Sequence, residues 1–492
     1  MSEPVTYIVV LALYLLLLVI VGVLTSRRMK SAEDFYVGGR NVGPWVTSLS
    51  YVAAYFSSVV IIGGGGFGYL YGMGTIWIAA ANVLIGCTLA WIVLGRRVRL
   101  FTARLGALTI PGFLAERFRA PSARILAAWV IALFLIIYNV AILKGMGNAF
   151  EGLMGIPYSA GVLLSAAVIV LYVALGGYLA VVWTGFFQAW VMGAGLILLT
   201  VAALHQSGGL EAVTLSLNSI DPGLVSTPGA WGWAGLASFA LITSLGVWGM
   251  PQMLARFVSI RSTKVMRLGT VIVTVGGAMA VLPYINGAIA RTRYPGLIAN
   301  PDLAIPTLTK DVLPPWAAAV FLAGVIAAGM STFAAILITT SSAVVRDFVQ
   351  KGLRRPLSER RAVRYSRLVS VAVGLISLAI ALRPPALVLV LMAFASAAVA
   401  STCLWPLLLG LYWRRTTRAG ALASMGVGLA TTLIWEALGQ PYGLQGFLPG
   451  IGVGLIAVLV VSLVTRRLPT EHVERIWHES AGSRVRSAGS SE

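Results

Sequence analysis

Long apolar stretches alternate with short polar intervals along almost the whole chain. Each stretch is roughly 20 residues long, which is enough for a helix to cross a hydrocarbon core of about 30 Å. The pattern predicts thirteen membrane-spanning helices, at about residues 5–24, 43–70, 74–95, 124–147, 158–176, 185–204, 234–252, 268–290, 315–345, 366–383, 385–410, 419–438 and 444–465.

The same pattern predicts how the chain is divided. Residues 1–465 are expected to form one transmembrane domain, and the more polar residues 466–492 a cytoplasmic tail that is disordered. Composition agrees, because 58% of the residues are hydrophobic and 11% are charged, against about 45–50% and 25% in soluble domains. The predicted fold class is therefore an all-α polytopic membrane protein.

The net charge of +20 comes from basic residues that are unevenly distributed. With the N-terminus outside, 31 of the 36 lysines and arginines lie in cytoplasmic intervals, at 25–42, 96–124, 253–267, 346–367, 411–418 and 466–492. Such an excess is what cytoplasmic loops carry, so the N-terminus is expected outside and the C-terminus inside. We interpret the charge as orientation in a cell inner membrane, with the lipid bilayer as partner; no nucleic acid is expected, and no protein partner is required.

Few side chains in the apolar stretches could carry enzyme chemistry. Cys87 and Cys403 lie inside predicted spans and are expected to be buried thiols, and the three histidines are too far apart to suggest a metal cluster. With no catalytic signature, we do not expect an enzyme. Only Glu436 of the 16 acidic residues lies near a span end, which weakens proton coupling, because proton relays normally use intramembrane Asp, Glu or His.

Two predicted spans contain residues at which a helix is expected to break. The first span of this kind carries the glycine run Gly63–Gly66, and the second carries Gly246, Gly249 and Pro251. Interrupted helices in corresponding positions of two halves indicate a transport site at the bilayer midplane. The alternative is that the glycines only allow neighbouring helices to approach closely.

These two spans are each the first of five. The first half covers residues 43–204 and the second covers 234–410, with extra helices at 5–24 and 419–465. The chain is thus expected to contain two structural repeats.

One predicted span, 315–345, carries many hydroxyl groups for a helix in lipid: Ser331, Thr332, Thr339, Thr340, Ser341 and Ser342. Ser331 and Thr332 are adjacent, so their side chains diverge by about 100° and can reach two sides of one ion. Neutral carbonyl and hydroxyl oxygens hold Na⁺ where a membrane helix unwinds. Alternatively, both hydroxyls bond to carbonyls one turn earlier in their own helix, and the residues alone do not decide between the two.

Four motifs resemble the sodium:solute symporter family: "DFYVGGRNVGPW" (34–45), "LGGYLAVVWTGFFQ" (175–188), "GMPQMLARFVS" (249–259) and "AAGMSTFAAILITTSSAVVRDF" (327–348). The resemblance extends over nearly the whole chain and implies the inverted five-helix repeat of the bacterial leucine transporter. Four further segments look most like the pantothenate permease branch, with monocarboxylate permeases nearby: "NAFEGLMGIPY" (148–158), "SGGLEAVTLSLNSIDPGLVSTPG" (207–229), "DLAIPTLTKDVLPPWAA" (302–318) and "LWPLLLGLYW" (404–413).

The resemblance implies a site for a co-transported Na⁺. In the family, two carbonyls of the first broken helix and one carbonyl and two hydroxyls of the eighth core helix hold the ion. The corresponding residues here are Ala53, Phe56, Ala328, Ser331 and Thr332.

The chain departs from the family pattern at two positions. Tyr55 stands where some members, such as the proline symporters, carry Asp, and the pantothenate branch shares the Tyr. Gly185 stands where the family carries an Asp that in some relatives belongs to a second sodium site or to the inner release path. Its loss puts a second Na⁺ in doubt and favours electroneutral transport of one Na⁺ with one monocarboxylate.

The solute is expected beside the sodium, between the broken helices and their neighbours. The candidate residues are Ser57, Ser58, Asn82, Tyr138, Thr243, Trp248 and Gln252. A helix N-terminus freed by a break would hold a carboxylate without a basic side chain. Lys144 is expected instead to extend its amine to the outer membrane surface.

The residues and the resemblance together predict a secondary active transporter. It would couple inward Na⁺ movement to uptake of a small carboxylate-bearing solute, pantothenate or another monocarboxylate, by alternating access. The alternatives are a symporter for an amino acid or a sugar, a proton-coupled or sodium-independent carrier, and a solute-sensing membrane module.

Overall fold

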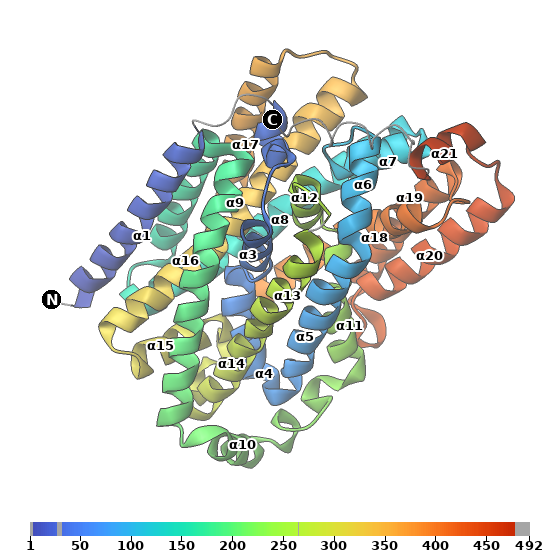
Figure 1. Cartoon of the computed structure of the whole chain (residues 1–492). Coiled ribbons are helices and arrows are strands. Elements are labelled where there is room, and N and C mark those ends of the chain that lie inside the picture. Colours follow the sequence, from blue (N-terminus) through green and yellow to red (C-terminus); the bar gives the residue numbers. More distant parts are fainter. Residues whose placement is uncertain (1–2, 27–31, 264, 478–492) are drawn as a thin grey trace.

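In a computed structural model of the protein, residues 3–26, 32–263 and 265–477 are described (Figure 1). Every named element in these residues is a helix, and paired extended backbone is limited to one isolated bridge between Val42 and Ile260. The predicted all-α class is therefore confirmed.

Each predicted span falls on helix. The longer helices are α1 (Glu3–Ser26), α8 (Pro121–Met154), α9 (Tyr158–Gln206), α16 (Pro315–Ser342), α17 (Glu359–Ala381), α18 (Val388–Tyr412), α19 (Arg418–Ala437) and α20 (Phe447–Val464). Within the described ranges, nine helical segments are long and apolar enough to cross a membrane. The number of crossings, thirteen, stays a prediction, partly because α9 joins two predicted spans across a kink at Gly177 (φ 61°).

Other predicted spans are divided into shorter helices. These are α3 (Pro44–Tyr55), α4 (Gly64–Tyr71), α5 (Ile76–Ala81), α6 (Arg96–Arg104), α11 (Gly232–Ser244), α12 (Pro251–Ser259), α13 (Val265–Gly277) and α14 (Val281–Arg293), with π-helical turns at Val59–Gly63, Asn82–Leu89, Trp91–Gly95 and Ala343–Gly352. The connections between spans form α2 (Ala32–Val37), α7 (Ile110–Phe118), α10 (Gly209–Ile220) and α15 (Ala304–Val312), and α21 (Thr470–Trp477) follows the last span.

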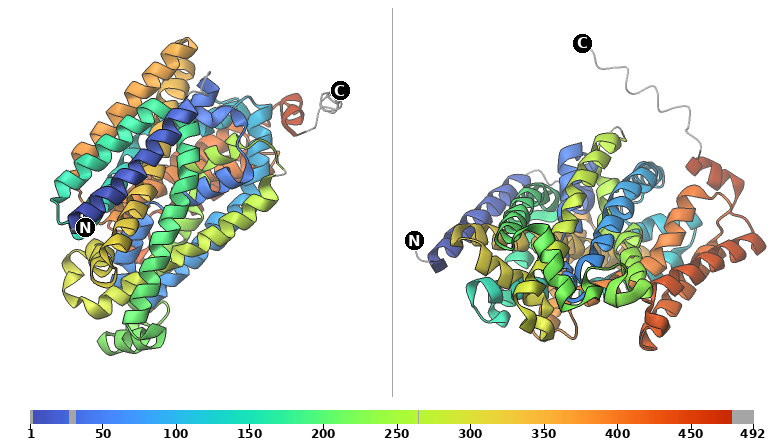
Figure 2. Two further views of the ribbon diagram at one scale, coloured as in Figure 1. Left: turned by 60° about the vertical axis from the view of Figure 1, so that its left-hand side comes forward. Right: turned by 90° about the horizontal axis from the view of Figure 1, so that it is seen from below.

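Helix α16 lies at the centre of the bundle. Its most apolar stretch is entirely buried, and it packs along α9 and against α1, α3 and α8. Helix α1 lies at one edge of the bundle and the pair α19 and α20 at the opposite edge (Figure 1, Figure 2). Of the two broken segments, α3–α4 and α12 are largely buried, whereas α11 keeps an exposed side at which Trp233 is 66% exposed.

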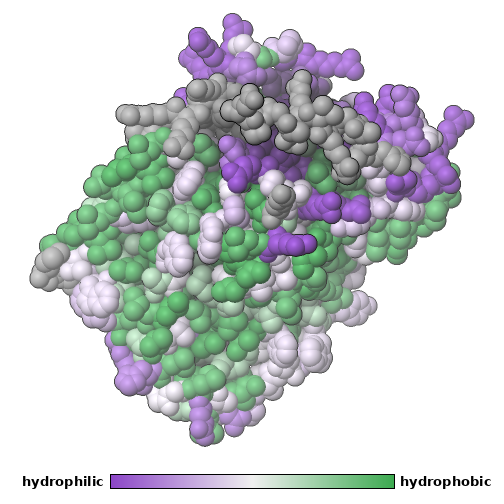
Figure 3. Space-filling model, viewed as in Figure 1, coloured by the Kyte–Doolittle hydropathy of each residue, from purple (hydrophilic) through white to green (hydrophobic). Residues whose placement is uncertain are grey.

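The outer surface divides into an apolar belt and polar ends. Figure 3 shows hydrophobic residues over the middle of the molecule and hydrophilic residues gathered at the end that carries α17 and α21. Large side chains within the belt are exposed, such as Leu13 at 62% and Val275 at 70%. Lipid would cover such a belt, and the polar end coincides with the basic intervals that the sequence places in the cytoplasm.

The tail differs in part from the expected disorder. Residues 470–477 form α21, whose Trp477 ring lies 4.6 Å from the Arg117 guanidinium. Arg104 Nη1 donates to the carbonyl of Ile476 (2.6 Å), and His472 Nε2 lies 3.2 Å from the carbonyl oxygen of Arg117. Helix α21 is thus anchored to the polar end of the bundle, which the sequence predicts to be cytoplasmic, while residues 478–492 lie outside the described residues.

The end of the bundle that the sequence predicts to be outside is held by a buried ion pair that the sequence did not suggest. Lys144 Nζ lies 3.0 Å from Asp302 Oδ2 and also donates to the carbonyl of Ala386 (2.9 Å). Asp302 is 1% exposed and accepts from the backbone N–H of Val388 at the start of α18 (3.1 Å). The expectation that Lys144 reaches the membrane surface is therefore wrong, because Asp302 neutralises the amine inside the protein and joins α8 to α18.

We predict that this pair contributes strongly to stability. Asp302→Asn should lower the free energy of unfolding by about 3 kcal/mol, since it leaves a buried cation unpaired. Asp311→Asn is the matched control, because the Arg293–Asp311 pair is as short (2.6 Å) but Asp311 is 46% exposed, and exposed pairs contribute at most about 1 kcal/mol. Thermal unfolding of the purified variants measures both, and equal losses would contradict the prediction.

A second prediction concerns pH. Burial lowers the pKa of His472 below its ordinary value of 6.5, Arg475, Arg117 and Arg119 lower it further, and the hydrogen bond with Arg117 opposes them. The anchored helix therefore binds the proton less well than a released helix. Anchoring is complete above about pH 6.5 and weakens as the pH falls through the lowered pKa.

Tryptic cleavage after Arg475 measures this release between pH 5 and pH 8. We expect cleavage to increase at acidic pH, after normalisation to His472→Gln, which keeps a donor for the Arg117 carbonyl but does not titrate. An identical pH profile for the two proteins would show that His472 does not control the anchoring.

Candidate functional site

The first helix break lies between α3 and α4. Helix α3 ends at Tyr55, and Phe56 leaves helical geometry with φ −91° and ψ 65° before a π-helical turn begins at Val59. The carbonyls in the last turn of a helix have no helical N–H partner. The break therefore turns carbonyl oxygens of α3 toward neighbouring helices.

The position of this break corrects the sequence-based expectation. The run Gly63–Gly66 is helical, with φ −70° and ψ −37° at Gly63. Side chains added there would meet the backbone of Leu389 at Gly63 (3.0 Å) and the Tyr284 ring at Gly64 (3.3 Å). For these glycines the packing alternative is correct, and the break lies a few residues earlier.

Ser331 and Thr332 meet the carbonyls that the break releases. Ser331 Oγ lies 2.8 Å from the carbonyl oxygen of Ala53, and Thr332 Oγ1 lies 2.8 Å from that of Ala54. Both hydroxyls also reach the carbonyl oxygen of Ala328, at 2.9 and 3.3 Å. The bonds to the carbonyl of Ala328 confirm that both hydroxyls bond within their own helix, and each also bonds across to α3. That the same hydroxyls hold Na⁺ stays a prediction.

Five oxygen atoms thus gather in one buried place: three carbonyls, of Ala53, Ala54 and Ala328, and the hydroxyls of Ser331 and Thr332. Each hydroxyl has one proton but faces two carbonyls. The set is neutral, made of hard oxygen ligands and 1% exposed at both hydroxyl residues, so it suits a small monovalent cation. By contrast, the hydroxyls of Thr339, Ser341 and Ser342 donate to carbonyls of their own helix.

The cluster overlaps the predicted sodium ligands without matching them fully. It contains Ala53, Ala328, Ser331 and Thr332, and it adds Ala54, which the sequence analysis missed. The carbonyl of Phe56 rests on the resemblance alone, and its ring packs edge-on against Tyr55 with centroids 5.1 Å apart.

The second break lies between α11 and α12. Residues 246–249 form a single 3₁₀ turn, Met250 is extended (φ −82°, ψ 113°), and Pro251 begins α12. Gly249 is required here, since a Cβ atom would lie 2.7 Å from the Cα of Ala400 on α18. Tyr55 joins the two breaks, because its hydroxyl donates to the carbonyl of Thr243 (2.8 Å).

A cavity of about 30 Å³, called the central cavity below, lies between the two breaks. It shares Ala54 with the oxygen cluster, and four predicted solute residues line it: Asn82, Tyr138, Thr243 and Gln252. Asn82 Oδ1 and Gln252 Oε1 are buried and have no hydrogen-bond partner in the described part of the chain. About 10–15 Å³ holds one water, so a larger solute requires the walls to move.

The other three predicted solute residues bond to the protein itself. Ser58 Oγ donates to the carbonyl of Ile142 (3.0 Å), and Trp248 Nε1 donates to the carbonyl of Ile85 (3.0 Å). Ser57 Oγ accepts from the N–H of Val59 (3.2 Å). None of these three lines the central cavity, so in this structure they brace the breaks.

Gly185 lies against the first broken helix. A Cβ atom at Gly185 would lie 2.9 Å from Ser50 Oγ and 3.2 Å from the Ser50 Cα. Helices α9 and α3 therefore approach closely at the position where the family pattern has an acid.

Comparison with known proteins agrees with this architecture. The sodium:solute symporter family profile matches residues 35–428. The chain is 31% identical to the osmoregulated proline transporter OpuE of Bacillus subtilis, covering 94% of this chain and 95% of the relative. It is 32% identical to the sodium/pantothenate symporter of Escherichia coli, covering 92% and 95%.

Solved structures show the same fold. A Na⁺-coupled sialic acid symporter superposes with a TM-score of 0.80 at 19% identity, over 94% of this chain and 99% of that one. The nucleobase-cation-symport-1 transporter Mhp1 superposes with a TM-score of 0.55 at 16% identity, over 89% and 97%. The expected leucine-transporter-type fold is confirmed. The chain belongs to the sodium:solute symporter family, and it is a multi-pass integral membrane transporter whose co-transported ion is Na⁺.

Proposed function

We propose that this protein takes up a small carboxylate-bearing solute together with one Na⁺, by alternating access around the two breaks. The observation that carries the proposal is the five-oxygen cluster of Ala53, Ala54, Ala328, Ser331 and Thr332, with the Phe56 carbonyl as a sixth ligand from the resemblance. In this proposal, residues 43–204 and 234–410 are the two repeats, and the protein is a carrier without enzymatic activity.

The central cavity supports a carboxylate as the solute's charged group. Among the described residues no charged side chain lines the cavity, so a Na⁺ at the adjoining cluster would supply a positive charge there and would favour an anion. The N-terminus of α12 begins at Pro251 beside the cavity wall, and a helix N-terminus attracts carboxylates. Both proline and pantothenate, which the relatives' names mention, carry a carboxylate.

The buried amides of Asn82 and Gln252 add specificity. Their side-chain oxygens accept hydrogen bonds and have no partner in the described residues, so they suit solute N–H or O–H groups. Pantothenate offers several such donors along its length. We therefore propose pantothenate or a related monocarboxylate first, and a symporter for an amino acid such as proline second.

The proposal is tested by uptake into proteoliposomes of labelled pantothenate, acetate, pyruvate and proline, with inward Na⁺ compared with K⁺ at equal pH. We expect one solute to enter only with Na⁺. Ser331→Ala and Thr332→Val should each raise the Na⁺ concentration for half-maximal uptake about tenfold, as losing about 1.4 kcal/mol of ion binding would do. Equal uptake in the two salts would favour a sodium-independent or proton-coupled carrier.

Ser341→Ala is the matched control for these variants. Its hydroxyl is equally buried on α16 but donates to the carbonyl of Ile338 (2.9 Å). The control should keep the wild-type Na⁺ dependence. A similar Na⁺ shift in the control would mean that the effect comes from α16 in general and not from the oxygen cluster.

A further prediction concerns the charge moved in each cycle. Gly185 removes an acid from a second ion position, and one Na⁺ with one monocarboxylate moves no net charge. An imposed potential of 100 mV should therefore change the uptake rate less than twofold. Each uncompensated charge would instead gain about 2.3 kcal/mol, roughly fiftyfold in accumulation.

Potassium diffusion potentials across the same proteoliposomes make this measurement. A potential-driven increase would indicate either a second Na⁺ or a zwitterionic solute such as proline. Repeating the experiment with each labelled solute separates those two cases.

A further inference from the structure

Arg256 is a buried cation that forms no ion pair with any described residue. It lies on α12 and is 0% exposed. Its Nη1 donates to the carbonyl of Gln252 (2.5 Å), whereas Nε and Nη2 have no hydrogen-bond partner among the described residues. The titratable groups that face it are Tyr51 on α3 and Tyr178 on α9. Both are phenols that donate elsewhere, to Gly86 and Ser259, so they supply no negative charge.

The two unpartnered nitrogens share one edge of the guanidinium group. Nε–H and the nearer Nη2–H point in the same direction, and this edge binds both oxygens of a carboxylate at once. An unpaired charge inside a membrane protein is costly, and those that remain commonly mark the path of a solute or an ion. The open edge of Arg256 therefore fits an anion that arrives from outside the protein's own residues.

Arg117 is a second buried arginine, and its guanidinium donates to backbone carbonyls. It is also 0% exposed, but its Nε donates to the carbonyl of Gly410 (2.8 Å) and its Nη2 to that of Trp413 (3.3 Å). Its guanidinium also stacks on the ring of Trp477 at 4.6 Å. The same edge that is open in Arg256 is filled by backbone carbonyls in Arg117.

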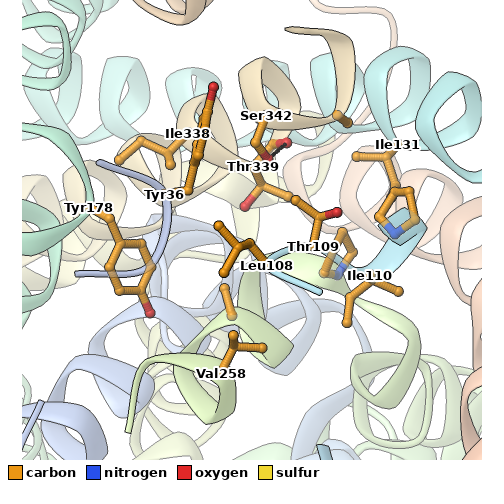
Figure 4. Close-up of a pocket in the computed structure, with 14 residues that line it drawn as sticks. Tyr36, Leu108, Thr109, Ile110, Ile131, Tyr178, Val258, Ile338, Thr339 and Ser342 are labelled. Carbon is orange, nitrogen blue, oxygen red and sulfur yellow. Dashed lines mark hydrogen bonds between the residues drawn. The ribbon is translucent and has the colours of Figure 1, made fainter. Parts of the chain in front are cut away.

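Arg256 lies one helical turn from a residue of the central cavity, although it lines neither cavity itself. Gln252 lines the central cavity, and Arg256, four residues later, lies on the same face of α12. One helical turn separates them, about 6 Å toward the cytoplasmic end. Tyr178, which faces Arg256, lines a second, inner cavity of about 20 Å³ between α2, α7, α8, α9, α12 and α16, as does Ala255, the residue before Arg256. Figure 4 shows Tyr178 on one side of this inner cavity and Ile131 on the opposite side.

We propose that Arg256 forms a second carboxylate-binding position, between the central cavity and the inner cavity. The solute's carboxylate leaves the Na⁺ side of the central cavity and pairs with Nε and Nη2 of Arg256 as the inner half opens. The position selects carboxylate-bearing solutes at the release step. This inference rests on the proposed function only in taking a carboxylate as the solute's charged group.

The first test needs no transport. Arg256→Met removes an unneutralised charge, so it should leave the thermal unfolding midpoint of the purified, solute-free protein equal or higher, since apolar residues replace buried charges at no loss or with a gain. Arg117→Met is the matched control and should lower the midpoint, because its carbonyl partners lose their donors. A midpoint that falls as far in Arg256→Met as in Arg117→Met would overturn the inference and make Arg256 structural.

The second test compares the two faces of the membrane, in right-side-out and inverted vesicles with labelled pantothenate and labelled proline. For the probe that wild type carries, Arg256→Gln should raise the half-saturating concentration on the cytoplasmic face at least tenfold, and on the outer face less than threefold. Arg256→Lys, which keeps the positive charge, should bring the half-saturating concentration on the cytoplasmic face part of the way back to the wild-type value. The Na⁺ concentration for half-maximal uptake should stay at the wild-type value, since the oxygen cluster is intact.

The outcomes separate this inference from the proposed function. Equal shifts on both faces, or none, would overturn the role of Arg256 while leaving Na⁺ coupling intact. Uptake of a probe by wild type without Na⁺ would overturn the coupling, and the comparison of faces would still decide the role of Arg256. A wild type that carries neither probe but carries uncharged solutes would overturn both.

Discussion

The structure depends on one constraint: a backbone carbonyl that leaves a helix inside a membrane must find another partner. The break after Tyr55 releases the carbonyls of Ala53 and Ala54, and α16 supplies the hydroxyls of Ser331 and Thr332 to meet them. This requirement places α16 against α3 at the centre of the bundle. The second break is met in the same way, since Tyr55 donates to the carbonyl of Thr243 across it.

The charged groups of the described residues are arranged in layers. At the outer end Lys144 and Asp302 neutralise each other, and in the middle the cavity is lined by neutral groups alone. Below it, Arg256 keeps an open edge, and the basic intervals lie at the cytoplasmic end. A cation and an anion that travel together would therefore meet a neutral centre first and a positive charge on the way in.

Much of this could be predicted from the sequence, and the parts that could not share a cause. The spans, the second break and the adjacent hydroxyls of Ser331 and Thr332 follow from local patterns of apolar, glycine and hydroxyl residues, whereas the first break lies before the glycine run that was expected to form it. Whether the carbonyl of Ala54 or of Phe56 faces α16 depends instead on backbone angles at the break. The function of Gly63–Gly66 depends on Tyr284 and Leu389, which belong to distant helices.

The buried charged residues also could not be predicted from the sequence. Asp302 lies in the connection between two predicted spans, where a charged residue is expected at the surface, yet it is 1% exposed. Its partner Lys144 is far away in the sequence, and one chain gives no sign of such a pairing. Arg256 falls inside a motif that carried the family resemblance, but only the structure shows that two of its nitrogens have no hydrogen-bond partner among the described residues.

Tyr55 has a consequence for how a protein of this kind can change during evolution. Its hydroxyl occupies the space where a Cβ atom at Gly86 would lie, and it supplies the donor for the Thr243 carbonyl. An Asp at this position, which the resemblance implies for the proline symporters, is shorter and, when ionised, cannot donate. Exchanging the two residues would empty space beside Gly86 and leave a buried carbonyl unmet, so a lineage could pass between them only through compensating substitutions on α11 and beside Gly86.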